Sequence, residues 1–96
     1  MKQKRFVVVT TNNERRGVFA GFLEEGQVGG TVRLSNARHC VYWSAETRGV
    51  CGLAAIGPQK GSRVGPVFPG IEVDGVTAIM DTSPEAMKRW EAEPWE

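Results

Sequence analysis

The sequence is poor in the residues that build metal centres and nucleophilic active sites. It has one histidine, His39, and two cysteines, Cys40 and Cys51, that lack the close paired spacing of a zinc knuckle. The segment 57–62 (GPQKGS) has the composition of a phosphate-binding loop but the wrong order. His39 and Cys40 are neighbours on a predicted strand, so they point to opposite faces. We therefore predict a protein that is not an enzyme and that binds no metal or other cofactor.

Long apolar runs are also missing. The run Phe6–Val9 is far shorter than the roughly 18 residues that a membrane-spanning helix needs. It is also too short for the apolar part of a signal peptide. We therefore expect no export signal and no membrane contact. In the reducing cytoplasm that this implies, Cys40 and Cys51 are expected to be free thiols packed as small hydrophobic residues.

Size and composition indicate an ordinary globular protein. The 96 residues, 41% of them hydrophobic and 24% charged, suit one domain that spans 1–96. The core of such a short chain is small, and the chain holds three tryptophans and four phenylalanines. Association of copies would bury further apolar area, so we predict a homo-oligomer.

Charge is unevenly distributed along the chain. Residues 1–63 contain ten Lys and Arg against four Glu, a net charge of +6, whereas residues 64–96 contain two against seven acids, a net charge of −5. Such a split is typical of a basic ligand surface backed by an acidic segment. Alternatively, the two parts attract each other within one fold.

Five segments have the β-branched, aromatic or alternating pattern of strands: residues 5–11, 17–23, 31–35, 39–43 and 71–80. In the third segment Val32 and Leu34 are expected inward and Arg33 outward. Gly17 and Gly21 indicate a bulge or a close backbone approach in the second. We therefore predict an α+β fold, a small strand-dominated sheet or partly open barrel of about four or five strands, with a short middle helix and a C-terminal helix.

The middle helix is predicted over residues 45–56, with Ser44 as its N-cap. Gly49 and Gly52 weaken this helix by about 1 kcal/mol each relative to alanine. Residues 57–70 are rich in glycine and proline and are expected to form an irregular loop.

The C-terminal helix is predicted to begin at Ser83 or Pro84 and to end at Pro94. Residues 82–85 (TSPE) combine a hydroxyl cap, a proline in the first turn and an acid at the positive end of the helix dipole. The face that we expect to pack against the sheet contains Ala86, Met87 and Trp90.

One stretch of the sequence combines arginines with aromatic rings. Guanidinium groups beside rings suit a planar anionic ligand, because the ring stacks on a base while the arginine binds phosphate or carboxylate. Alternatively, the aromatic residues belong to the core at the strand-to-helix junction, and Arg38 caps carbonyl groups of the adjacent loop. We predict ligand or partner binding by Arg33, Arg38, Tyr42, Trp43 and Arg48.

The other basic residues are interpreted as solvated. Lys2, Lys4 and Arg5 are expected at an exposed chain start, and Arg15 and Arg16 at a hairpin tip. The sequence contains no recognition helix, so sequence-specific DNA binding is not expected.

Several segments together resemble a known family. They are Gly17–Gly21, the block Asn36–Ser44 (NARHCVYWS), Val76–Ile79 and Thr82–Ala86. The chain resembles a family of short bacteriophage and prophage proteins of unknown function. Residues 45–46 (AE) depart from the Gly-Ala of that family. The resemblance implies a phage origin and does not imply an activity.

Two classes of function follow. The first is a non-enzymatic inhibitor of a host antiviral defence system, acting in the host cytoplasm by sequestering an anionic small molecule such as a nucleotide or by blocking a host defence protein. The second is a structural or assembly accessory of the virion that uses the sheet and the C-terminal residues Trp90 and Trp95 as interfaces.

Overall fold

The computed structural model describes residues 5–11 and 17–92. It confirms the predicted α+β fold, with six strands instead of four or five. The predictions for Lys2, Lys4, Arg15, Arg16, Pro94 and Trp95 concern residues outside the described ones. The elements are β1 (Phe6–Thr11), β2 (Val18–Gly26), β3 (Val32–Tyr42), the 3₁₀ helix η1 (Ala45–Thr47), α1 (Gly49–Ala55), β4 (Arg63–Val64), β5 (Phe68–Val73), β6 (Val76–Asp81) and α2 (Pro84–Ala92).

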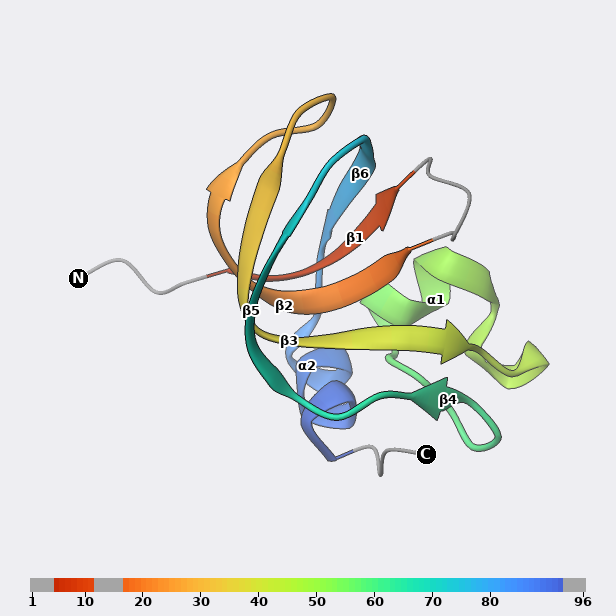
Figure 1. The fold of residues 1–96 in the computed structure, drawn as a ribbon. Coiled ribbons are helices and arrows are strands. Elements are labelled where there is room, and N and C mark those ends of the chain that lie inside the picture. The colour runs from red at the N-terminus through yellow and green to blue at the C-terminus, as the bar shows by residue number, and fades with distance from the viewer. Residues whose placement is uncertain (1–4, 12–16, 93–96) are drawn as a thin grey trace.

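The strands form a strongly curved antiparallel sheet in the order β4-β3-β2-β1-β6 (Figure 1). The first half of β3 also pairs with β5, whereas its last residues pair with β4. β5 and β6 follow each other across a turn at Asp74 and Gly75, but they pair with different strands. The predicted strand 71–80 is therefore two strands, separated by this turn.

The core is divided into two clusters by β1, whose side chains alternate between its two faces. Val7 and Val9 pack into the hollow of the curved sheet with Val32, Leu34 and Val73. Phe6 and Val8 point to the other face. There they pack in a second cluster that includes Val18, Ala20, Cys40, Leu53, Ala54, Val64 and Trp90. We call these clusters the barrel core and the helix-side core.

The side chains of β3 switch faces of the sheet at Asn36. The predicted segments 31–35 and 39–43 are one continuous strand, because the expected interruption is a register shift: Phe22 pairs with Ser35, but Ala20 pairs with Arg38. Asn36 has a left-handed φ of 46° and is the extra residue. Leu34 before the shift packs in the barrel core, whereas the even-numbered Cys40 after it packs in the helix-side core.

The predicted middle helix is interrupted. Residues 45–56 form η1 and the short helix α1, because Arg48 and Gly49 between them have left-handed φ values of 70° and 79°. The Ser44 side chain makes no capping hydrogen bond, contrary to the prediction. Gly52 explains the break, since a Cβ atom there would collide with the backbone oxygen of Thr47. No side chain larger than hydrogen fits this crossing.

Buried hydroxyl groups hold this segment to the rest of the fold. Thr47 is fully buried, and its Oγ1 accepts a hydrogen bond from the backbone N–H of Gln59 at 3.0 Å. The Ser62 hydroxyl lies 3.2 Å from Thr47 Oγ1 and accepts a bond from the N–H of Ser44 at 3.0 Å. Residues 57–70, predicted as an irregular loop, therefore include β4 and the start of β5 in ordered positions.

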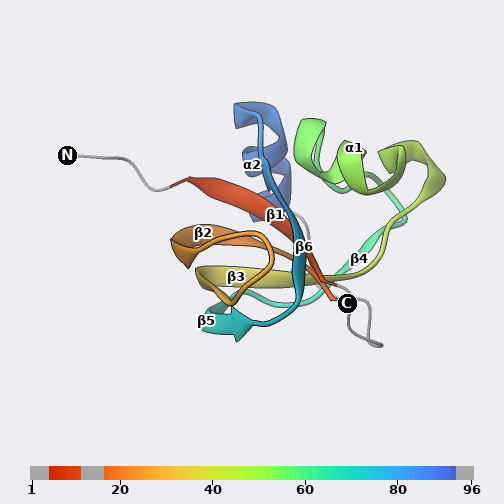
Figure 2. The same cartoon turned by 90° about the horizontal axis from the view of Figure 1, so that it is seen from above.

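The C-terminal helix α2 begins at Pro84, as predicted. The Ser83 hydroxyl accepts a bond from the N–H of Ala86 and donates one to the carbonyl of Ala55 in α1. Trp90 is 0% exposed, and its indole N–H donates to the carbonyl of Leu53 at 2.9 Å. Figure 2 shows that α1 and α2 lie together over one face of the sheet.

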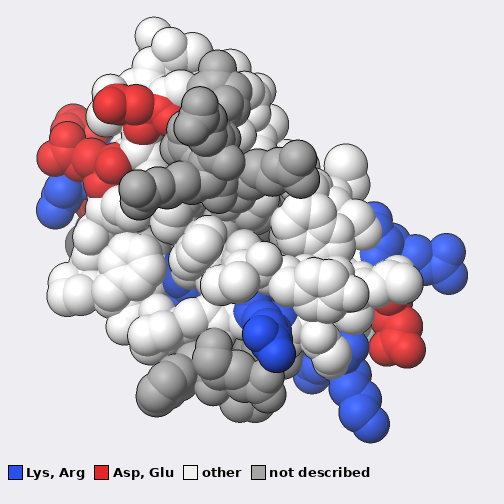
Figure 3. All heavy atoms as spheres, turned by 45° about the vertical axis from the view of Figure 1, so that its right-hand side comes forward, with Lys and Arg blue, Asp and Glu red and all other residues white. Residues whose placement is uncertain are grey.

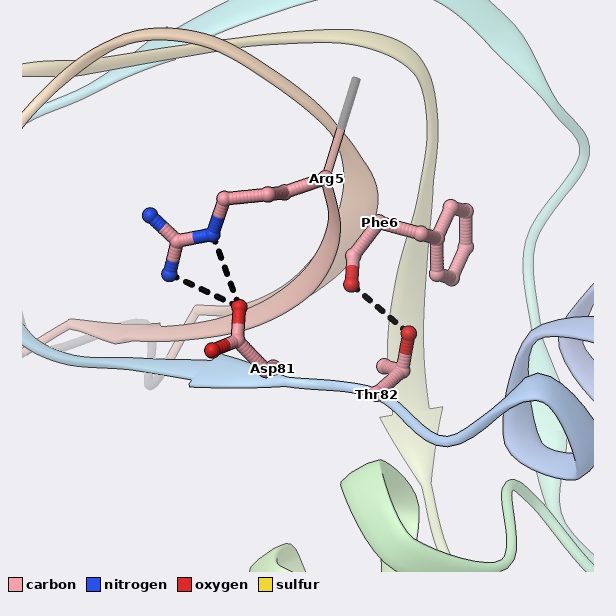
Figure 4. Close-up of polar contacts among 4 residues, drawn as sticks. All are labelled: Arg5, Phe6, Asp81 and Thr82. Carbon is pink, nitrogen blue, oxygen red and sulfur yellow. Dashed lines mark hydrogen bonds and ion pairs between the residues drawn. The ribbon is translucent and has the colours of Figure 1, made fainter. Parts of the chain in front are cut away.

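Polar contacts fix the point where β6 leads into α2. The Thr82 hydroxyl donates to the carbonyl of Phe6 at 2.6 Å, and Arg5 binds Asp81 through Nε at 2.8 Å (Figure 4). Because Phe6 lies on β1, these contacts tie the start of α2 to a central strand.

The two cysteines are both free thiols, but only one packs as predicted. Cys40 is buried in the helix-side core. Cys51 is exposed on α1, so the prediction that it packs as a small hydrophobic residue is wrong. The short helix α1 buries Leu53 and Ala54, and Cys51 lies on its opposite side.

Candidate functional site

Arg33 lies at the start of β3, among acidic side chains. Its Nη1 lies 3.3 Å from Glu72 Oε1, with both side chains about half exposed, and its backbone pairs with Glu25. Tyr42 lies nine positions after Arg33, so up to about 30 Å of strand separates the two at roughly 3.3 Å per residue. The structure therefore does not bring Arg33 together with the other predicted binding residues. We call this region the acidic end and define it by Glu24, Glu25, Glu72 and Asp74.

Arg38 follows the register shift and is turned under the helices, where it is 4% exposed. Its Nε donates to the carbonyl of Gly65 at 2.8 Å, and its Nη1 donates to the carbonyl of Trp90 at 2.6 Å. These bonds tie the β4–β5 connection and the last turn of α2 to β3. The alternative interpretation, in which Arg38 caps loop carbonyls, describes this position.

A cavity of about 300 Å³ lies beside Arg38. The rings of Phe6 and Phe22 meet in its wall edge to face, with their centroids 5.2 Å apart. Its mostly apolar lining suits a small apolar group. The residues that line it are Phe6, Phe22, Asn36, Arg38, Val67, Trp90 and Glu91.

Tyr42 and Trp43 have different surroundings at the end of β3. Trp43 is half buried against the helix-side core, as in the core interpretation. A second register shift, in which Cys40 pairs with Val64 and Tyr42 pairs with Arg63, leaves Val41 as the extra residue. This shift turns Tyr42 out of the core, and the residue is 56% exposed.

Three further basic residues follow Tyr42 in the chain, and one of them, Arg63, pairs with it across β3 and β4. Arg48, Lys60 and Arg63 are all exposed, and Glu46 is the acidic residue of the same segment. Within residues 5–11 and 17–92, these three basic side chains form no ion pair and no hydrogen bond. Figure 3 shows most Lys and Arg along the right and lower parts of one face, with one acidic group among them, and most acidic groups at its upper left, with one basic group beside them. We call Arg48, Lys60 and Arg63 the basic end.

The sequence pattern does not identify Arg63 as a member of this surface. The residue lies in the glycine- and proline-rich segment 57–70, where no pattern long enough for a strand is present. The available signal was the triplet 62–64 (SRV), in which Ser62 and Val64 are buried and Arg63 is exposed. A two-residue strand is too short for this alternation to be recognised.

His39 stacks on Phe19, its partner on β2, with ring centroids 4.8 Å apart and planes inclined by 28°. Partial burial removes water from the imidazole and lowers the pKa of His39 below its ordinary value of 6.5. The ring is therefore neutral at pH 7. Among the described residues, no three His, Cys, Asp or Glu side chains lie close enough together to hold a metal ion.

In the described part of the chain, no helix is long and apolar enough to cross a membrane.

Comparisons with known proteins identify a family. No curated protein and no solved structure matches the chain. The model of a family described as "Domain of unknown function (DUF6948)" matches residues 4–90, nearly the whole sequence. The chain therefore belongs to this family of domains of unknown function.

Proposed function

We propose that this protein is a non-enzymatic binding protein whose basic end holds an anionic partner. The observation that carries the proposal is the contrast between exposed arginines. Arg33 at the acidic end is paired with Glu72, whereas Arg48 and Arg63 form no ion pair among the described residues and lie in one segment with exposed Tyr42. An exposed guanidinium group can bind a phosphate or carboxylate of a partner.

The distribution of charge supports this proposal. β3 runs from the acidic end to the basic end, so opposite charges lie at the two ends of one long strand (Figures 1 and 3). Such a separation orients an approaching anion and raises its rate of association at low salt. Arg48 also has a left-handed backbone, which costs a residue other than glycine about 1 kcal/mol or more. Strain of this kind is concentrated at functional sites.

The biological role that we propose is inhibition of a host antiviral defence system. The resemblance of the Asn36–Ser44 block to short phage and prophage proteins supports a phage origin, with action in the host cytoplasm. The anionic partner is then a nucleotide signal or the nucleic-acid-handling part of a defence complex. A homo-oligomer would present several basic ends at once and so increase avidity.

A virion accessory protein is the second candidate, and exposed apolar side chains favour it. Val41 and Val67 are 58% and 56% exposed; Val41 precedes Tyr42 in β3, and Val67 lines the cavity beside Arg38. Exposed apolar side chains mark a surface that contacts another protein when they form a contiguous patch. In this role the basic end would orient the copies within an assembly.

The proposal can be tested with two double variants that remove the same charge. Arg48→Ala/Arg63→Ala disrupts the basic end, whereas Arg5→Ala/Arg33→Ala removes two exposed arginines that are paired with Asp81 and Glu72. We expect the wild type and the second variant to bind heparin, a generic polyanion, and to restore plating of a phage restricted by a defence system. The first variant should elute from heparin at lower salt and lose the restoration. Equal behaviour of the two variants would contradict the proposal.

A further inference from the structure

We infer that the anionic partner is single-stranded nucleic acid, with a base stacked on the ring of Tyr42 and its phosphates held by the basic end. This inference rests on the proposed function and names the partner of the same surface.

The register places a ring and a guanidinium group side by side. Tyr42 and Arg63 are direct partners in the antiparallel pair β3–β4. Directly opposite residues point to the same side of a sheet, with Cβ atoms about 5 Å apart. Val64, which follows Arg63, is fully buried, so Arg63 points to solvent. Tyr42 is therefore presented to solvent on the same side as Arg63.

A nucleobase fits this arrangement. The Tyr42 side chain makes no hydrogen bond among the described residues, and both it and Arg63 are exposed, so the ring is open to a planar group. Stacking on an aromatic ring tolerates any base, and an adjacent arginine binds the sugar-phosphate backbone. A partner protein with acidic side chains would use the cations but would not need the ring.

The open surface favours a polymer over a free nucleotide. A small ligand is bound tightly when a pocket buries about 70–90% of its surface. The cavity of about 300 Å³ beside Arg38 is lined by other residues than Tyr42, Arg48 and Arg63. The hollow between α2 and residues 56–60 is lined by Lys60 of the basic end but not by Tyr42, Arg48 or Arg63, and the hollow at the start of α2 is lined by none of these four residues. An exposed ring with Arg63 beside it instead matches a base and a phosphate that are contacted in succession along a strand.

A single strand is favoured over a duplex because the Tyr42 ring needs an accessible base face. In a duplex each base is covered by its neighbours, and a protein that reads the duplex inserts a helix or ribbon into a groove. α1 is seven residues long and buries Gly52, Leu53 and Ala54. α2 buries Ala86 and Trp90. The described helices therefore serve the helix-side core.

The test uses the full chain and fluorescence anisotropy with a labelled 12-nucleotide oligothymidylate. The competitors are AMP, a duplex of the same length, and inorganic polyphosphate. The matched variants are Tyr42→Ala, which removes the ring, and Tyr42→Phe, which keeps it. We expect Tyr42→Ala to weaken oligothymidylate binding about tenfold, with Tyr42→Phe close to wild type. Three phosphate contacts should give a slope of log K against log salt of about −2.

The outcomes separate the inference from the proposed function. Loss of oligothymidylate binding in Tyr42→Ala with unchanged polyphosphate binding supports the inference. Equal effects of Tyr42→Ala and Tyr42→Phe, or tighter binding of AMP or duplex, overturn it while leaving an anion-binding protein. Absence of binding to oligothymidylate, AMP, duplex and polyphosphate overturns both. Circular dichroism of each variant checks that the fold is retained.

Discussion

The two halves of β3 show how one strand can serve two purposes. The first half, up to Ser35, lies between β2 and β5 and contributes Val32 and Leu34 to the barrel core. The second half lies between β2 and the short β4, and it packs Cys40 under the helices. The outer end of the first half carries the ion pair of Arg33 and Glu72, whereas the outer end of the second half carries the exposed ring of Tyr42 beside Arg63. The register shifts at Asn36 and Val41 separate these environments.

Arginine shows the consequence most clearly. On this strand Arg33 is an exposed member of an ion pair, and Arg38 is a buried clamp on two carbonyl groups. Arg63, on the neighbouring strand, is exposed beside Tyr42. Residue type and alternation alone assign all three to a surface. Their actual positions depend on the bulges, which change the face to which every later residue points.

The largest effect is expected from Arg38→Ala. Removal of this side chain leaves the carbonyls of Gly65 and Trp90 without the donors that they have now, in a buried region. Hydrogen bonds from charged groups contribute about 1.5–3 kcal/mol each, so we expect a loss of about 3 kcal/mol in the free energy of unfolding. Urea denaturation measures the loss.

Arg38→Lys is the control for this change, because it keeps the charge but not the forked geometry. We expect an intermediate loss for it. An Arg38→Ala protein with wild-type stability but weakened anion binding would contradict the structural role and return Arg38 to the binding surface.

Much of the fold could be predicted from sequence because several signals agree. The TSPE sequence of residues 82–85 places the start of α2 correctly, and periodicity places Ala86 and Trp90 in the core. Val32 and Leu34 are buried and Arg33 is exposed, as alternation requires. These elements are long enough for local pattern and tertiary packing to give the same result.

The rest could not be predicted because it depends on contacts between distant segments. Thr47, next to the break at Arg48, bonds to Gln59 and Ser62, and β4 exists through its pairing with Cys40 and Tyr42. The five predicted binding residues lie close together in the sequence, but closeness in the sequence does not place side chains on one surface. The structure separates Arg33 and Arg38 from Tyr42, and it adds Arg63 in their place.

The second largest effect concerns the register shift at Asn36, where φ is 46°. Asparagine tolerates this conformation better than most residues, and glycine adopts it without cost. We expect Asn36→Ala to lower the free energy of unfolding by about 1 kcal/mol and Asn36→Gly to be neutral or slightly stabilising. Thermal unfolding of the two variants checks the sign. Equal losses would show that the asparagine side chain, and not the backbone, holds the bulge.

A smaller effect is expected on acidification because of His39. Burial lowers its pKa below 6.5 in the folded protein, so the unfolded chain binds more protons between the two pKa values. Stability should therefore be unaffected by this group above pH 6.5 and should fall as the pH decreases below it. His39→Phe keeps the ring against Phe19 but cannot be protonated. The difference in melting temperature between pH 7.5 and pH 5.5 should be smaller for this variant than for the wild type.

The smallest effect is expected from Arg33→Ala, the same substitution as at Arg38 but in the first half of β3. Its bond to Glu72 is 3.3 Å long and both side chains are exposed to water. Exposed pairs contribute about 0–1 kcal/mol, so we expect a loss below about 0.5 kcal/mol that disappears in high salt. A double-mutant cycle with Glu72→Ala isolates the pair from other effects. A loss comparable to that of Arg38→Ala would show that the acidic end, too, depends on its arginine for folding, and would remove the distinction between the two halves of β3.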